Sequence, residues 1–195
     1  MTINQNITSN SDHLSQARRS LANSRFWSGT LLGVGVASNV IYAHAPLAAF
    51  AAMSGATLSR RRAVSVALFI WFVNQTLGFG LRGYPLTPVA FSWGILMGMG
   101  TLLSVIVTSW RPSRMNQNSW VGSVGGMAIA TVLGFAIYQS LILFAFPVLA
   151  EGHLMGWEIV GQLFVKHLTW AGGITIVHSL LLWRTVKRPR SVIES

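Results

Sequence analysis

Six runs of apolar residues follow one another along the chain, separated by short polar segments. They lie, within a few residues, at 26–43, 46–59, 63–81, 87–110, 120–149 and 156–183. A helix needs about 20 mostly apolar residues to cross a bilayer, with about 17 as the lower limit, and the last four runs exceed that limit. The pattern predicts an all-α fold: a polytopic membrane helix bundle with about six transmembrane segments.

The first two runs, 26–43 and 46–59, are together too long for one straight span and barely long enough for two. His44, Ala45 and Pro46 break the helical pattern between them, because proline disfavours helical backbone in the residue before it. Two arrangements fit: a tight hairpin of two crossings, or one crossing followed by a re-entrant piece. Whether 46–59 spans the membrane stays open at this point.

Basic residues flank the apolar runs in short clusters. They precede the first run and follow the second, fourth and sixth runs: Arg18, Arg19, Arg25, Arg60, Arg61, Arg62, Arg111, Arg114, Arg184, Lys187, Arg188 and Arg190. Cytoplasmic loops of membrane proteins are enriched in arginine and lysine, so these clusters predict that both termini are cytoplasmic. Six segments satisfy this condition, because an even number of crossings then separates the first two clusters.

Three parts follow from this topology: a flexible cytoplasmic tail at 1–24, a transmembrane helix bundle at 25–185 and a basic cytoplasmic tail at 186–195. The first part is polar and shows no hydrophobic periodicity, which favours a flexible chain.

Composition supports a membrane environment. Of the 195 residues, 52% are hydrophobic and 9% are charged, whereas soluble domains average about a quarter charged. We expect a multi-pass protein of the bacterial inner (cytoplasmic) membrane, surrounded by the lipid bilayer. The net charge of +10 does not indicate a nucleic-acid partner, because the basic residues lie between apolar runs. The chain has no cysteine, which excludes disulfides and thiolate metal sites.

Two adjacent amides, Asn74 and Gln75, interrupt the third apolar run. One interpretation is that each bonds a neighbouring helix, where such bonds contribute about 0.6 kcal/mol. The other is that they line a cavity open to the outer side, near Arg82 and Tyr84 and within reach of His44 in the first outer turn. Amides donate and accept hydrogen bonds without charge, which suits a neutral or zwitterionic ligand.

The last run begins with a polar stripe, in which Glu158, Gln162 and Lys166 stand four residues apart. In one arrangement 156–167 is an amphipathic helix on the outer surface and only 168–183 crosses the membrane. In the other, which we favour, the stripe faces the bundle interior and meets polar residues of the fifth run. The second arrangement completes a set of candidate substrate-binding residues: His44, Asn74, Gln75, Arg82, Tyr84, Tyr138, Gln139, Glu158, Gln162 and His167.

Catalysis has little support in the sequence. There is no glycine-rich nucleotide loop, no nucleophile elbow and no zinc-binding helix, and the histidines are too scattered to define a metal site. We therefore expect no enzyme activity, no metal and no cofactor. A membrane-embedded enzyme with His167 or Glu158 as its acid–base group is the least supported hypothesis.

An alanine ridge, Ala48, Ala52 and Ala56, recurs every four residues on the second run. Such ridges let helices approach closely, either inside a bundle or against another membrane protein. In size, helix number, orientation and this ridge, residues 26–183 resemble the substrate-binding S components of energy-coupling-factor vitamin transporters. The resemblance implies a ligand such as cobalamin, docking of a transmembrane coupling protein on the alanine ridge, and ATPase subunits as further partners.

These observations predict an integral membrane transporter, or a substrate-binding membrane subunit, for uptake of a small organic nutrient such as a vitamin. The alternative is a non-transporting accessory or assembly subunit of a membrane complex.

Overall fold

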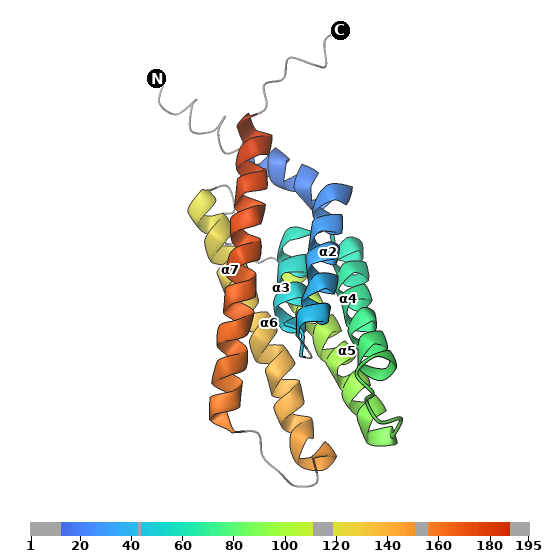
Figure 1. Ribbon diagram of the computed structural model, residues 1–195. Coiled ribbons are helices and arrows are strands. Elements are labelled where there is room, and N and C mark those ends of the chain that lie inside the picture. The colour runs from blue at the N-terminus through green and yellow to red at the C-terminus, as the bar shows by residue number, and fades with distance from the viewer. Residues whose placement is uncertain (1–12, 43, 111–118, 151–155, 188–195) are drawn as a thin grey trace, which may run out of the picture.

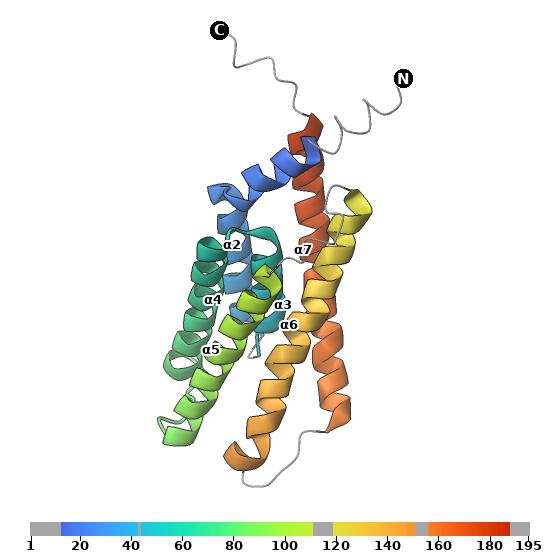
Figure 2. The same ribbon diagram turned by 180° about the vertical axis from the view of Figure 1, so that it is seen from behind.

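The computed structural model describes residues 13–42, 44–110, 119–150 and 156–187, and in these ranges the fold is all-α. Residues 13–22 are helical. They are followed by six longer helices: α2 (Arg25–Ile41), α3 (Leu47–Thr57), α4 (Arg60–Gly80), α5 (Pro88–Ser109), α6 (Trp120–Leu149) and α7 (Trp157–Lys187). The helices run up and down along one bundle axis, and residues 13–22 lie at the same end as the C-terminus of α7 (Figures 1 and 2).

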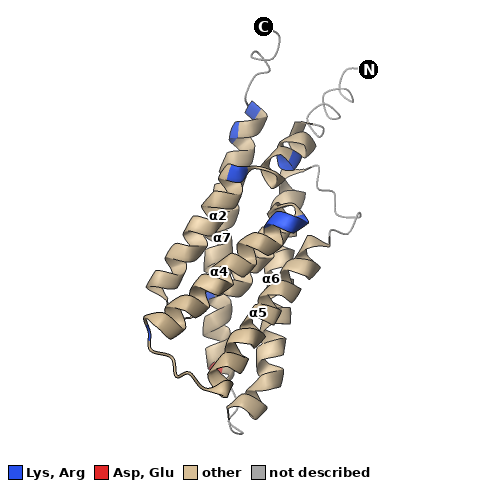
Figure 3. Cartoon of the chain, turned by 90° about the vertical axis from the view of Figure 1, so that its right-hand side faces the viewer, with Lys and Arg blue, Asp and Glu red and all other residues tan. Residues whose placement is uncertain are grey.

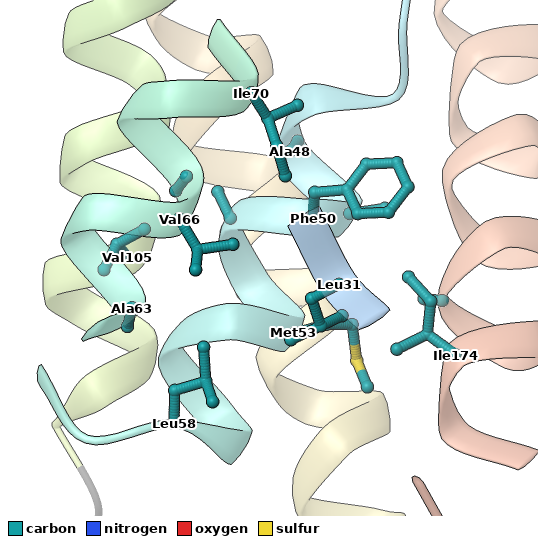
Figure 4. Close-up of a cluster of buried hydrophobic side chains, with 14 of the residues drawn as sticks. Leu31, Ala48, Phe50, Met53, Leu58, Ala63, Val66, Ile70, Val105 and Ile174 are labelled. Carbon is teal, nitrogen blue, oxygen red and sulfur yellow. The ribbon is translucent and has the colours of Figure 1, made fainter. Parts of the chain in front are cut away.

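The short helix α3 lies at the centre of the bundle. It contacts α2, α4, α5, α6 and α7, and all of its residues except Ala56 are buried. Side chains of α3 pack among Leu31 of α2, Val66 of α4 and Ile174 of α7 (Figure 4). With 11 residues, α3 is about 16 Å long, so it cannot cross a bilayer of about 30 Å.

Small residues let the neighbouring helices approach α3. A Cβ added to Gly134 of α6 would lie 2.7 Å from the Cβ of Ala52, and one added to Gly55 would lie 2.8 Å from the carbonyl oxygen of Val105. Backbones that approach this closely exclude any larger side chain at the contact. Small residues such as Ala52 and Gly55 of α3 therefore stand where neighbouring helices approach most closely.

The predicted docking role is wrong for Ala48 and Ala52, which are buried, whereas Ala56 is partly exposed. Ala48 and Ala52 are both 0% exposed, and Ala52 packs on Gly134 of the same chain. These two positions are filled by the protein's own helices, so they cannot receive another subunit.

The flexible tail predicted for 1–24 is wrong for residues 13–22, which are helical. Leu14, Ala17 and Leu21 are spaced at i, i+3 and i+7 and are buried against the bundle. The segment is also tied to the start of α4, because the backbone N–H of Ser59 donates to the carbonyl of Ala22 at 3.0 Å. The periodicity is easily missed because one of its three apolar positions is only an alanine. Residues 1–12 lie outside the described residues.

Most of the arginine and lysine residues gather at one end of the bundle, where α4 begins and α7 ends (Figure 3). We call this end the arginine end. The described members of the predicted clusters on α2, α4 and α7 lie there: Arg25, Arg60, Arg61, Arg62, Arg184 and Lys187. Arg111, Arg114, Arg188 and Arg190 fall outside the described residues.

Large apolar side chains lie on the surface of the bundle, and several polar side chains are buried inside it. Large apolar side chains such as Phe72 and Phe144 are exposed, at 59% and 86%, whereas Asn74 and Gln139 are buried, at 5% and 4% exposed. Helices α4, α5 and α6 are also long and apolar enough to cross a membrane. The protein is therefore membrane-associated.

The contact between Ala52 and Gly134 gives a direct test of the packing around α3. We expect Gly134→Ala to lower the free energy of unfolding by about 1–3 kcal/mol, because the new methyl group has no room against α3. Gly125→Ala is the matched control on the same helix, since a Cβ there meets nothing within 4 Å. Unfolding by denaturant in mixed micelles measures both variants, and equal effects would contradict the central position of α3.

Candidate substrate-binding cavity

A cavity of about 360 Å³ lies at the N-terminal end of α3, away from the arginine end. It is lined by the α2–α3 and α4–α5 turns, the second half of α4, the first half of α5, the second half of α6 and the first half of α7. Its volume is within the range of pockets that hold small organic ligands.

The cavity exists because α3 stops before its neighbours do. Helices α6 and α7 have 30 and 31 residues, which makes each about 45 Å long, against about 16 Å for α3. Beyond Leu47, where α3 begins, the space between α4, α5, α6 and α7 is no longer filled by a helix. Leu47 and Ala45 form the end of the cavity that faces α3.

Seven of the ten residues predicted from sequence line this one cavity: His44, Asn74, Gln75, Tyr84, Tyr138, Gln139 and His167. The apolar part of the lining includes Trp93, Met97 and Phe146, which sequence reasoning did not single out. Their only signal in the sequence was membership of an apolar run.

The buried amides form a chain of hydrogen bonds that joins α4 to α2. Gln75 Nε2 donates to Asn74 Oδ1 at 3.3 Å, and Asn74 Nδ2 donates to Asn39 Oδ1 at 2.7 Å. Asn39 Nδ2 in turn donates to the carbonyl of Gly35 at 2.8 Å. Asn39, which is 0% exposed, was missed in the sequence, although an amide inside an apolar run is a usable signal.

The two interpretations of Asn74 and Gln75 therefore combine. Asn74 bonds a neighbouring helix, and both side chains line the cavity. Gln75 fits because Gly94 of α5 has no side chain, and a Cβ there would lie 2.6 Å from Gln75 Oε1.

His167 is held deep in the same cavity, with 4% of its surface exposed. Its Nδ1 lies 2.7 Å from the carbonyl oxygen of Leu163. The ring also packs near Phe135 and Tyr138, with centroid distances of 5.1 and 6.5 Å. These contacts fix the position of the imidazole.

Three predicted residues do not line the cavity: Arg82, Glu158 and Gln162. Gln162 Nε2 donates to Glu158 Oε1 at 3.4 Å on an exposed face of α7, so this part of the polar stripe does not face the interior. The alternative of a separate surface helix at 156–167 does not hold either, because α7 is continuous from Trp157 to Lys187 (Figure 1).

Arg82 and Lys166 instead bind the end of α2 and the turn that follows it. The Arg82 guanidinium donates to the carbonyls of Asn39 and Tyr42, and Lys166 Nζ donates to the carbonyl of His44 at 2.9 Å. The last carbonyls of a helix lack partners within the helix and carry partial negative charge, so Arg82 stabilises this end of α2, while Lys166 binds the turn that follows it. They position the α2–α3 turn beside the cavity.

The same two cations act on His44 in that turn. Partial burial lowers the pKa of His44 below its usual value of 6.5, and the positive charges of Lys166 and Arg82 lower it further. The neutral imidazole is therefore favoured at neutral pH, and the cavity lining contains no Asp, Glu, Lys or Arg. The site is polar without carrying a net charge.

Comparison of the chain with protein-family models, with curated proteins and with solved structures gives no match in any of the three. The cavity must therefore be interpreted from its own geometry.

The amide chain can be tested by a double-mutant cycle. We expect Asn74→Leu alone to cost about 1–3 kcal/mol of unfolding free energy, because Asn39 Oδ1 then stays buried without its donor. In the Asn74→Leu variant, Asn39→Leu should lower the free energy of unfolding by less than it does in the wild-type protein, because both partners are then apolar. Additive losses in unfolding titrations would show that the two amides do not interact.

The electrostatics of the turn can be tested through His44. We expect Lys166→Gln to raise the pKa of His44, because a neutral side chain no longer disfavours the imidazolium. Lys187→Gln, at the far end of α7, is the charge-matched control and should leave this pKa unchanged. An NMR titration of the histidine rings measures both, and an unchanged His44 pKa in the Lys166 variant would contradict the contact.

Proposed function

We propose that the protein is a membrane carrier, or a substrate-binding membrane subunit, that takes up a small, uncharged organic nutrient such as a vitamin. The observation that carries the proposal is the convergence of polar side chains from three helices and two turns on one cavity of about 360 Å³. Amide, phenol and imidazole groups beside aromatic and aliphatic surface are the usual lining of a small-molecule site.

The proposed topology has six segments and cytoplasmic termini. Its support is the arginine end, since cytoplasmic ends of membrane bundles are rich in arginine and lysine. Helices α2 and α4 both begin at that end (Figure 1), so α3 returns the chain to it while crossing only part of the bilayer. The cavity, at the other end, would then receive its ligand from the outer side.

The proposed ligand is compact. The cavity volume lies near the lower end of the range for drug-sized ligands, which favours a small vitamin or related nutrient over a molecule as large as cobalamin. The sequence has no nucleotide-binding loop of the Walker type. Energy would therefore come from a partner with ATPase subunits or from trapping of the ligand after entry.

Native mass spectrometry from mild detergent tests this function, since it detects bound small molecules and bound subunits together. We expect the protein to retain one small organic compound. Replacing Asn74 by alanine and Gln75 by leucine should abolish its retention, because the hydrogen bonds to the ligand are lost. Thr76→Ala is the matched control, since Thr76 is exposed and bonds only its own helix, at Phe72.

Unchanged ligand retention in a folded double variant would overturn the assignment of this cavity. A partner protein at fixed stoichiometry with no small molecule would instead support the accessory-subunit alternative.

A further inference from the structure

We infer that the ligand of this cavity presents a hydrogen-bond donor, a hydroxyl or N–H group, to Nε2 of His167. The inference rests on the proposed function, because it names the chemistry that the same cavity selects. It follows from three properties of His167: the hydrogen bond of one ring nitrogen, the unsatisfied state of the other, and the charge of the surrounding lining.

The first property fixes the tautomer. Nδ1 lies 2.7 Å from the carbonyl oxygen of Leu163, and a carbonyl oxygen only accepts hydrogen bonds. Nδ1 must therefore carry the hydrogen. In the neutral imidazole the other nitrogen, Nε2, then carries a lone pair and acts as an acceptor.

The second property is that this lone pair has no partner among the described residues. His167 Nε2 is buried and makes no hydrogen bond, although the residue lines the cavity. The chain of amides does not supply this donor, since the hydrogen bonds of Gln75 Nε2 and Asn74 Nδ2 reach Asn74 and Asn39 and neither reaches His167. A buried acceptor without a partner is costly, so the site is complete only when something donates to it.

The third property restricts the charge of that partner. The lining residues include no Asp or Glu that would balance an imidazolium, which favours the neutral ring in the apolar surroundings of Phe135 and Tyr138. A carboxylate placed against Nε2 would meet a lone pair and be repelled. Alcohols, phenols and N–H heterocycles match the site, and carboxylates and quaternary ammonium groups do not.

The tautomer can be measured without any ligand. NMR of protein labelled with ¹⁵N-histidine should show His167 with hydrogen on Nδ1 and none on Nε2, and His167→Phe identifies its signals. A ring with hydrogen on Nε2 would overturn the inference while leaving the cavity and its proposed function intact.

Binding of a matched pair of probes tests the donor directly. 2-Naphthol and 2-methoxynaphthalene share one ring system, but only the first has a hydroxyl hydrogen. We expect 2-naphthol to bind the wild-type protein about three- to tenfold more tightly, the gain of one net hydrogen bond, and to shift the Nε2 resonance of His167. His167→Phe should abolish the preference, whereas His178→Phe, on the same helix but beside a separate cavity, should retain it.

The outcomes separate the two proposals. Equal affinity for both probes, with no shift at Nε2, would overturn the donor inference and leave the cavity as a binding site. Failure of both probes to perturb His167 would overturn the inference together with the assignment of this cavity as the ligand site.

Discussion

The structure depends on one constraint: a helix of 11 residues is enclosed by helices up to nearly three times as long. Enclosure on all sides demands small residues on α3 and on the helices facing it, as the contact of Ala52 with Gly134 shows. Because α3 is too short to fill the bundle from end to end, space remains beyond its start. The cavity is thus a consequence of the length of α3.

The polar groups around that space follow from the same constraint. An amide facing acyl chains would lose its hydrogen bonds, whereas one facing the interior can find partners on another helix. Asn39 and Asn74 satisfy each other across α2 and α4, and Gln75 extends the chain to the cavity surface. Arg82 and Lys166 have a different role, since Arg82 binds the end of α2 and Lys166 binds the turn that borders the cavity. The two cations therefore hold the backbone beside the cavity, while uncharged side chains line the cavity itself.

Much of this arrangement could be predicted from sequence, because the energetic penalty for polar groups in lipid makes each of them conspicuous. The all-α fold and the cavity residues from Asn74 to His167 followed from that argument. The burial of Ala48 and Ala52 could not be predicted in this way, because small residues occur both inside a helix bundle and at its contacts with other proteins. The exposure of Glu158 and Gln162 was also not predicted, since helical spacing places residues on one face of a helix without showing whether that face is turned inward or outward. The helix at residues 13–22 was not predicted because its apolar positions are few and one of them is only an alanine.

The central claim is that the space beyond α3 is an open, polar site on the outer side of the membrane, and cysteine labelling tests it most directly. The chain has no cysteine of its own, so a single cysteine introduced at Gln139 in the cavity, or at Ala52 in α3, is the only thiol that the reagent can label. A membrane-impermeant thiol reagent added from the outside should label Gln139→Cys and leave Ala52→Cys unmodified. Labelling of Gln139→Cys only from the cytoplasmic side, or at neither side, would contradict the account.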